Sequence, residues 1–418
     1  MNCGRLYGVV IGLVLLCAGP AFCADASATT TATPAAKHKK KRRKTAAVTH
    51  AGTATASTTQ AGVIHTNATY SVTKVALARR TRRHKVFFNP WTEPTYADST
   101  VGDNIDGEDL VVRKAAVDAI GPFNGSVVVV DPQTGRILSV VNQKLAFKGA
   151  YQPCSTVKMV VSAASLSEGI IDPTKRMHIT RRVSMDMTDA LAHSNNLYFA
   201  KMGEELGFDR VEKYAKLFGL GEKAGLDIPG EEAGFLTPEP PNTGVGMMTS
   251  FGDGIRLTPV ELASVVSTIA NGGTMYYLQY PRSEEEVQKF VPRIKRELEL
   301  ASIVPSIKAG MMGAVEYGTA RRAGYDLNEP ILGKTGTCTD TIQPGVHLGW
   351  FGSFNDVGTH KLVVVVLLTG GRGVSGSVAA SVAGNVYHNL SQQRYFASDT
   401  QLQSSQPVIP TALISLGH

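Results

Sequence analysis

Residues 125–141 read Gly-Ser-Val-Val-Val-Val-Asp-Pro-Gln-Thr-Gly-Arg-Ile-Leu-Ser-Val-Val. Two runs rich in β-branched residues flank a Pro/Gly turn, which predicts a β-hairpin. Three further strand-like runs cover residues 331–338, 347–354 and 361–369, and the chain between the two groups has mainly helical patterns. This order of elements along the chain, two strands, several helices, three strands and a last helix, predicts an α+β fold. In it, an antiparallel five-stranded sheet, flanked by helices, lies beside an all-helical lobe.

Helix signals fill the segment between the hairpin and the last three strands. The best-defined start is Thr258-Pro259-Val260-Glu261, which combines an N-cap hydroxyl, a proline at the first helical position and a capping-box glutamate. The predicted helices cover residues 155–169, 195–205, 209–218, 258–271, 305–316 and, after the last strand, 377–390.

The two ends of the chain differ in composition from the part between them. An apolar stretch over residues 6–23 follows Arg5 and precedes Ala24-Asp25-Ala26. This pattern predicts a secretory signal peptide with a small-residue cleavage site, and an uncleaved anchor is the alternative. The next residues are rich in Ala, Thr, Lys and Arg and predict a disordered tail. The predicted segments are a signal peptide at 1–26, a basic tail at 27–100, a folded domain at 110–395 and a polar C-terminal tail at 396–418.

The net charge of +7 originates in the predicted tail. Residues 1–90 hold fourteen Lys and Arg residues and one acid, so the rest of the chain is net negative. The basic residues cluster at 37–44 and 79–85. They form either a solvated tail or a segment attracted to anionic lipid or wall polymers. Because the signal peptide predicts export, to the periplasm or the outer face of the cytoplasmic membrane, no nucleic-acid partner is expected.

Three short motifs indicate nucleophilic catalysis: Ser155-Thr-Val-Lys158, Ser194-Asn-Asn196 and Lys334-Thr-Gly-Thr337. A serine hydroxyl is a good nucleophile only with a base within hydrogen-bond reach. At i, i+3 spacing on a helix, Ser155 and Lys158 share one face, about 5–6 Å apart at Cβ. Lys158 must be neutral to accept a proton, which requires burial or a neighbouring positive charge such as that of Lys334.

The remaining motif residues fit the same chemistry. Ser194 could relay a proton to a departing amine, and the Lys334 strand offers hydroxyls suited to a substrate carboxylate. Each motif alone is weak, because 71–74 and 353–355 match the first two patterns by chance, in the polar tail and on a predicted strand. The three motifs proposed here occur in order at a helix start, in an interhelical loop and on a strand, as this chemistry requires.

From about residue 125 to 390 the chain resembles the transpeptidase domain of monofunctional penicillin-binding proteins. Besides the three motifs, Val130-Asp-Pro-Gln-Thr-Gly135, Tyr151-Gln-Pro-Cys-Ser155, Gly252-Asp-Gly-Ile-Arg-Leu-Thr-Pro259 and Ala270-Asn-Gly-Gly273 contribute to the resemblance. It implies a penicillin-binding/β-lactamase-like fold with the active site in the cleft between sheet and helical lobe. The implied enzyme is a serine-type D-Ala-D-Ala acyltransferase without a cofactor, a D,D-transpeptidase of peptidoglycan stem peptides that β-lactam antibiotics inhibit covalently.

The resemblance also assigns a role to each motif residue. The backbone N–H groups of Ser155 and Thr337 would form an oxyanion hole, which contributes several kcal/mol in such sites. No metal-ligand spacing occurs among the ten histidines. The implied assignments are Ser155 as acylated nucleophile, Lys158 as general base, Ser194 and Lys334 as proton-relay groups, and Asn196, Thr335, Gly336 and Thr337 as substrate-binding residues.

Related activities remain alternatives. A D,D-carboxypeptidase or endopeptidase uses the same residues with water as acceptor. A serine β-lactamase needs fast deacylation, but the Glu-x-x-Leu-Asn pattern of class A enzymes does not occur, and Asn196 stands where class D enzymes have Val. A non-catalytic penicillin-binding sensor is least favoured because every catalytic position is retained.

Two connections, 142–153 and 159–193, are shorter than usual in the family. Nothing before residue 110 fits a glycosyltransferase, so a separate one is implied.

Cys154 and Cys338 are the cysteines expected in the mature chain, because the other three lie in the predicted leader. The implied oxyanion hole brings the backbones of Ser155 and Thr337 together, and the two cysteines are their immediate neighbours. Some class A carbapenem-hydrolysing β-lactamases have a similar arrangement. We therefore predict a disulfide in an oxidising compartment, with two buried free thiols as the alternative.

Overall fold

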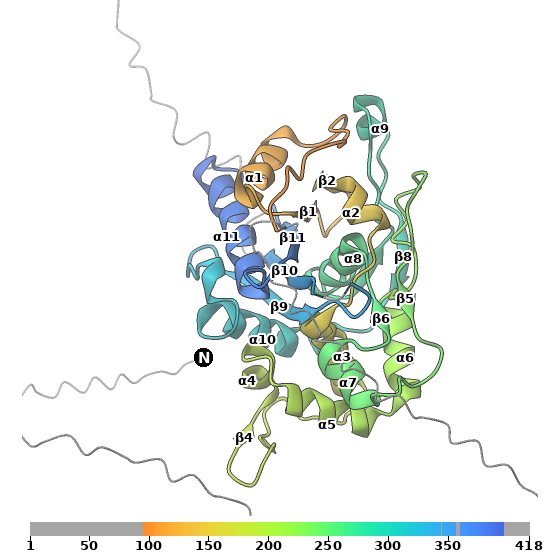
Figure 1. Cartoon of the computed structure of the whole chain (residues 1–418), viewed down its shortest axis with the longest axis vertical. Helices are drawn as coiled ribbons and strands as arrows, with labels where there is room; N and C mark the ends of the chain where they lie inside the picture. Colours follow the sequence, from red (N-terminus) through yellow and green to blue (C-terminus); the bar gives the residue numbers. More distant parts are fainter. Residues whose placement is uncertain (1–94, 344, 357–359, 397–418) are drawn as a thin grey trace, which may run out of the picture. The chain divides into compact units, whose positions relative to one another are not determined.

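The computed structural model describes residues 95–343, 345–356 and 360–396 (Figure 1). At its centre is an antiparallel sheet of five strands in the order β2-β1-β11-β10-β9. The predicted hairpin pairs with the last strand of the chain, so distant segments complete one sheet, and β9 is left at an edge. The predicted α+β fold is confirmed. The strands are β1 (Gly125–Val130), β2 (Ile137–Val141), β9 (Ile331–Thr339), β10 (His347–Asn355) and β11 (Val363–Gly370).

Helices occupy most of the chain between the two groups of strands, and every helix predicted from the sequence is present. The first helix and four short ones, α2, α4, α7 and α9, were not predicted. The helices are α1 (Leu110–Ile120), α2 (Gln143–Lys148), the 3₁₀ turn η1 (Cys154–Val157), α3 (Lys158–Ser167), α4 (Met187–Ala192), α5 (Asn196–Leu206), α6 (Phe208–Leu217), α7 (Val245–Phe251), α8 (Pro259–Ala270), α9 (Glu284–Gln288), α10 (Val304–Glu316), the 3₁₀ turn η2 (Arg321–Ala323) and α11 (Gly376–Gln392). Three two-stranded ribbons join β3 (Met177–His178) to β4 (Ser184–Met185), β5 (Phe235–Leu236) to β6 (Ile255–Arg256), and β7 (Thr274–Tyr276) to β8 (Ile294–Glu297).

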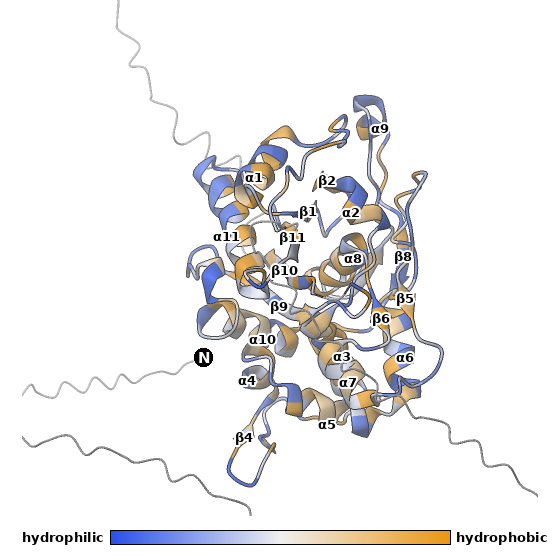
Figure 2. Cartoon of the chain, viewed as in Figure 1, coloured by the Kyte–Doolittle hydropathy of each residue, from blue (hydrophilic) through white to orange (hydrophobic). Residues whose placement is uncertain are grey.

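Both faces of the sheet are buried, because successive strand residues point to opposite sides. Val128 and Val365 join the core cluster that includes α8 and α3, whereas Val127 and Val366 join the cluster formed with α1 and α11. Figure 1 shows α8 on one side of the sheet and α1 with α11 on the other. Hydrophobic residues run along the buried α8, whereas the exposed α9 is mainly hydrophilic (Figure 2). The sheet therefore forms a rigid support between two layers of helices.

The start of α8 has the predicted capping box. Glu261 N donates to Thr258 Oγ1 at 3.2 Å, and Thr258 N donates to Glu261 Oε2 at 2.7 Å. The other carboxylate oxygen of Glu261 accepts from Gly221 N at 3.0 Å. One glutamate therefore both begins the central helix and ties a loop of the helical lobe to it.

The predicted boundaries at the start of the folded domain were wrong, because the ordered structure includes residues that the sequence assigned to the tail. Thr95 Oγ1 accepts a hydrogen bond from Gly371 N at 2.7 Å, just after β11. Ser99 Oγ donates to Phe123 O at 2.8 Å, and Ser99 is buried. A chain that starts at residue 100 would therefore lose contacts that hold this end of the sheet.

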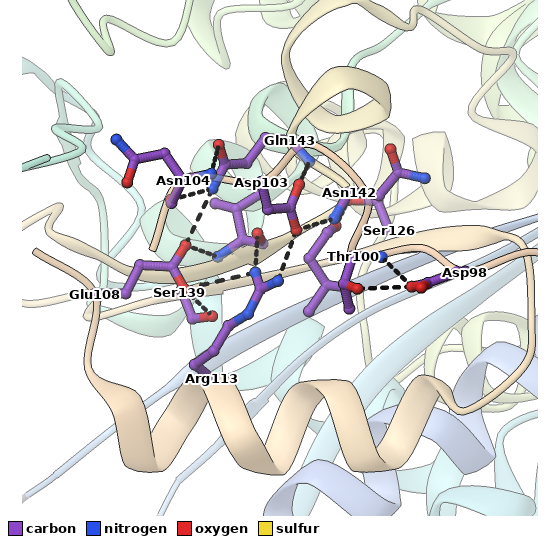
Figure 3. A network of polar contacts seen from close by, with 12 residues as sticks. Asp98, Thr100, Asp103, Asn104, Glu108, Arg113, Ser126, Ser139, Asn142 and Gln143 are labelled. Atoms are coloured by element: carbon purple, nitrogen blue, oxygen red, sulfur yellow. Dashed lines mark hydrogen bonds and ion pairs between the residues drawn. The ribbon is translucent and has the colours of Figure 1, made fainter. Parts of the chain in front are cut away.

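A polar network joins the same segment to α1 and the β2 edge (Figure 3). Arg113 of α1 lies between two acids, with a 2.7 Å ion pair to Asp103 and a 3.6 Å pair to Glu108, and donates to Val140 O at 2.6 Å. Glu108 also accepts from Ser139 Oγ at 2.8 Å. These buried charges are stable because each is paired or hydrogen-bonded. Since these contacts are polar, apolar periodicity could not reveal this segment.

Several predictions concern residues outside the described ranges. They are the signal peptide at 1–26, the tail up to residue 94, the chance motif at 71–74, and the C-terminal tail from residue 397. In the residues that the structure does describe, no helix is both long and apolar enough to cross a bilayer.

Candidate active site

Ser155 lies in η1, the turn that leads into α3. The backbone of Cys154 before it has a φ of 50°, in the left-handed region that residues other than glycine rarely adopt. Gln152 O accepts a hydrogen bond from Trp350 Nε1 at 2.9 Å, which fixes the turn to β10. Ser155 Oγ is 3.4 Å from Ser250 O, a long hydrogen bond, so the hydroxyl is weakly held and available for reaction.

Lys158 begins α3 and is completely buried. Its Nζ donates to Ser194 O at 2.8 Å, lies 3.1 Å from Ser194 Oγ, and donates to Asn196 Oδ1 at 2.6 Å. The structure therefore joins two of the three predicted motifs through this amine. Among the hydrogen bonds of the described residues, none links Lys158 Nζ to Ser155 Oγ. Such base–nucleophile contacts often form only when substrate binds.

Burial lowers the pKa of Lys158 to about 7, because desolvation disfavours the ammonium form. A neutral amine has two N–H groups and one lone pair. The carbonyl oxygen of Ser194 and Oδ1 of Asn196 can only accept hydrogen bonds, so they take the two N–H groups. The lone pair is then left for a hydroxyl, and Lys158 is suited to accept a proton near neutral pH.

The turn between α4 and α5 presents Ser194 and Asn196 to the lysine. Ser194 has a φ of 54°, which turns the chain sharply at the end of α4. Asn195 then caps α5, since its side chain accepts a hydrogen bond from Tyr198 N at 2.9 Å. The sequence did not single out Asn195. Its role is to begin the helix that directs Asn196 toward Lys158.

Lys334 is completely buried on β9, and its Nζ donates to Thr335 O at 2.9 Å. Burial holds the pKa of Lys334 well below its ordinary value, and the positive charge of Lys158 lowers this pKa further. The two lysines therefore interact electrostatically. For Lys158 itself, burial is the cause of the lowered pKa, rather than the charge of Lys334.

The two threonines of the strand motif already have hydrogen-bond partners. Thr335 Oγ1 lies 2.6 Å from Thr319 Oγ1, and Thr337 Oγ1 accepts from Gly376 N at 2.8 Å. The hydroxyl proton of Thr337 is therefore free to donate to an anion. Because β9 is an edge strand, its outer backbone groups are also free of strand partners.

β9 and the nucleophile turn approach each other closely. A Cβ atom at Gly336 would lie 2.9 Å from Pro153 O, so only glycine fits this position. A disulfide joins Cys154 to Cys338, with their Cα atoms 5.7 Å apart. The predicted pairing is thus present in the structure, and it joins the residue before Ser155 to the residue after Thr337.

A second link, which the sequence did not reveal, lies beside the disulfide. Arg256 of β6 donates to Ala150 O and forms a 3.3 Å ion pair with Asp340, whose carboxylate is buried. Ala150 precedes the nucleophile turn and Asp340 follows β9. The arginine therefore holds the same two segments together as the disulfide, and it and its two partners come from three separate parts of the chain.

We expect loss of the disulfide to lower the free energy of unfolding by up to about 5 kcal/mol in the chain-entropy model, because the bond closes a loop of 184 residues. Urea unfolding of the oxidised and reduced protein would measure this difference. The double variant Cys154→Ala/Cys338→Ala is the control, and reductant should leave its unfolding curve unchanged. Two titratable thiols in protein purified from an oxidising compartment would contradict the pairing.

The chance motif at 353–355 has a structural role. Ser353 is buried in β10, and its Oγ donates to Val364 O at 2.9 Å and lies 3.3 Å from the Tyr387 hydroxyl of α11. It therefore faces the side of the sheet that α11 covers.

In the described ranges no group of three or more His, Cys, Asp or Glu side chains could hold a metal ion.

Comparison with known proteins agrees with this geometry. Residues 125–388 match the family model described as penicillin binding protein transpeptidase domain. Stage V sporulation protein D of Bacillus subtilis is 29% identical over 311 residues, which cover 64% of this chain and 47% of that protein. The peptidoglycan D,D-transpeptidase MrdA of Haemophilus influenzae is 24% identical over 392 residues, covering 75% and 59%. The chain thus spans about half the length of these curated relatives.

A solved structure has the same fold. Pseudomonas aeruginosa PBP2, in complex with WCK 5153, superposes with a TM-score of 0.58 at 23% sequence identity. The match covers 70% of this chain and 78% of that one.

Proposed function

The chain belongs to the penicillin-binding protein transpeptidase domain family, and on this premise we propose that it is a D,D-transpeptidase acting on peptidoglycan stem peptides. The observation that most supports the proposal is the buried Lys158 amine, with a pKa of about 7, between the nucleophile helix and the loop carrying Ser194. A lysine on a protein surface would stay protonated and could not act as a base. Among the hydrogen-bond partners of the Lys158 amine in the described residues there is no carboxylate that would stabilise its charged form.

In the proposed acylation, Ser155 Oγ attacks the carbonyl carbon of the D-Ala–D-Ala peptide bond while its proton passes to Lys158 Nζ. The N–H groups of Ser155 and Thr337 stabilise the oxyanion of the tetrahedral intermediate. A proton then reaches the departing amine through Ser194, the C–N bond breaks, and the terminal D-Ala leaves. The product is an ester between Ser155 and the shortened stem peptide.

Deacylation completes the transfer. The amine of a second stem peptide attacks the ester carbonyl, its proton passes to the Lys158–Ser194 pair, and Ser155 is released as the alcohol. The terminal carboxylate of the donor would lie against Lys334 and the hydroxyls of Thr335 and Thr337. A strand edge with hydroxyl groups and a lysine amine suits an anion, and the site has no acid among these partners that would repel it.

For the whole protein we propose export to the periplasm or the outer face of the cytoplasmic membrane, where stem peptides occur. The basic tail would attract the protein to anionic lipid or wall polymers. A separate glycosyltransferase would supply the glycan strands. β-Lactam antibiotics would act as covalent inhibitors, because they present an acylating carbonyl beside a carboxylate.

Product analysis tests the reaction. We expect the full-length protein, incubated with a D-Ala-D-Ala peptide and an amine acceptor, to release D-Ala and form the peptide–amine conjugate. Mass spectrometry would detect both products. Release of D-Ala with only the hydrolysed peptide would assign a carboxypeptidase instead.

We expect the penicilloyl adduct to persist for many minutes. The Glu-x-x-Leu-Asn pattern of deacylating class A enzymes does not occur in the sequence, and in the described part of the chain no Asp or Glu is hydrogen-bonded to Ser155, Lys158, Ser194 or Asn196. Intact-mass spectrometry over time would follow the adduct. Hydrolysis of free penicillin at tens of turnovers per second would instead indicate a β-lactamase.

A further inference from the structure

Thr319 lies in the turn after α10, between two parts of the active site. Its backbone N donates to Ala192 O at 3.1 Å, and its Oγ1 lies 3.4 Å from the same oxygen. Its Oγ1 also lies 2.6 Å from Thr335 Oγ1 on β9. Ala192 is the last residue of α4, two residues before Ser194. One side chain therefore connects the strand of the carboxylate-binding motif to the loop of the proton relay.

The local sequence is suited to this close contact. A Cβ atom at Gly318 would overlap Ala192 O, so the turn can approach α4 only with glycine at this position. The turn is fixed in addition by hydrogen bonds from Gly318 N to Gly313 O at 2.8 Å and from Ala320 N to Ala314 O at 2.7 Å. The position of the Thr319 hydroxyl is thus set by the backbone rather than by a mobile loop.

The two hydroxyls have one proton each, which limits their arrangements. Without an anion, Thr335 can donate to Thr319, and Thr319 can donate to Ala192 O. When a carboxylate is next to Thr335, the charged acceptor forms the stronger hydrogen bond and takes the Thr335 proton. Thr319 can then donate to Thr335 instead of Ala192. The oxygen of Thr335 thus remains hydrogen-bonded in both states.

We propose that Thr319 is a positioning residue that orients the Thr335 hydroxyl toward the substrate carboxylate and holds β9 at a fixed distance from the Ser194 loop. This inference rests on the proposed function. Thr319 itself need not touch the substrate. It acts by keeping the Thr335 proton available for the anion.

The test compares two acylating probes that differ only in the anion, benzylpenicillin and its methyl ester. In the full-length protein, Thr319→Val replaces the hydroxyl by a methyl group, and Thr319→Ser retains it. We expect Thr319→Val to lower the second-order rate of acylation by benzylpenicillin about tenfold relative to the methyl ester. Thr319→Ser should restore the wild-type ratio. Thr319→Ala also removes the hydroxyl but places no methyl group beside Ala192 O. It therefore separates loss of the hydroxyl from a steric effect of the valine.

A double-variant cycle adds a second readout. In a Thr335→Val background, Thr319→Val should not lower the rate of acylation by benzylpenicillin any further relative to the rate with the methyl ester. An equal loss of rate with both probes, or no loss with either, would overturn the inference, since a merely structural role does not distinguish them. If the wild-type protein is not acylated at Ser155 by either probe, the proposed function itself fails, and the inference fails with it.

Discussion

Ser155→Ala should abolish covalent labelling by a fluorescent penicillin. The acyl bond needs an oxygen nucleophile at this position, and the neighbouring hydroxyl of Ser194 is held by the amine of Lys158. Gel fluorescence of the purified variant would show the loss, and peptide mapping of the wild-type adduct should identify Ser155. The change removes only one oxygen with a single long hydrogen bond, so the fold should be retained.

Two matched controls accompany this variant. Ser353→Ala removes a hydroxyl that bonds within the sheet, so it should affect stability but leave labelling intact. Ser71→Ala tests the chance match at 71–74 and should have no effect. A labelled Ser155→Ala protein, or an adduct mapped to another serine, would show that the nucleophile has been assigned wrongly.

The sheet and the catalytic motifs could be predicted because their signals are local. Runs rich in β-branched residues with a Pro/Gly turn define the hairpin, and the three catalytic motifs are informative together because they occur in order on the expected elements. The pairing of Cys154 with Cys338 was predicted from the oxyanion hole that the family resemblance implies, because the two cysteines are the neighbours of Ser155 and Thr337. For the hairpin and the helix starts, a short stretch of sequence contains the physical reason for the structure.

The features that the sequence did not reveal depend on pairs of polar residues rather than on apolar patterns. The ion pairs of Arg113 with Asp103 and Glu108 fix a segment just before α1 that the sequence assigned to no domain. Arg256 and Asp340 hold the nucleophile turn and β9 together although 84 positions separate them. None of these pairs has a period, a spacing or an apolar pattern that marks it.

The acceptors of Lys158 were also only partly predictable. The sequence placed Lys158 and Ser194 in one site, but the contact with the Ser194 carbonyl depends on the left-handed turn at that residue. Likewise, nothing in the motifs pointed to Thr319, because its significance arises from a tight glycine turn packed against the end of α4. Backbone geometry, rather than residue type, decides both contacts.

Lys158→Ala should lower the rate of acylation by about 10²–10⁴-fold, the usual contribution of a general base. Lys158→Arg should be equally inactive, because a guanidinium stays protonated at every accessible pH and cannot accept the Ser155 proton. Stopped-flow measurement of acylation by benzylpenicillin gives the rates. Lys175→Ala, at a lysine that is mostly exposed and paired with Asp172, is the matched control and should retain the wild-type rate.

The pH dependence in the wild-type protein distinguishes a base from a structural lysine. Since the pKa of Lys158 is lowered to about 7, the amine is protonated and inactive below this pH and neutral above it. We expect the acylation rate to fall about tenfold for each pH unit below 7, where the neutral fraction falls by the same factor, and to level off on the alkaline side. Rates measured between pH 5 and 9 would show this profile. A rate that does not change across this range, or that still rises tenfold per unit between pH 8 and 9, would mean that Lys158 does not titrate as the base of this site.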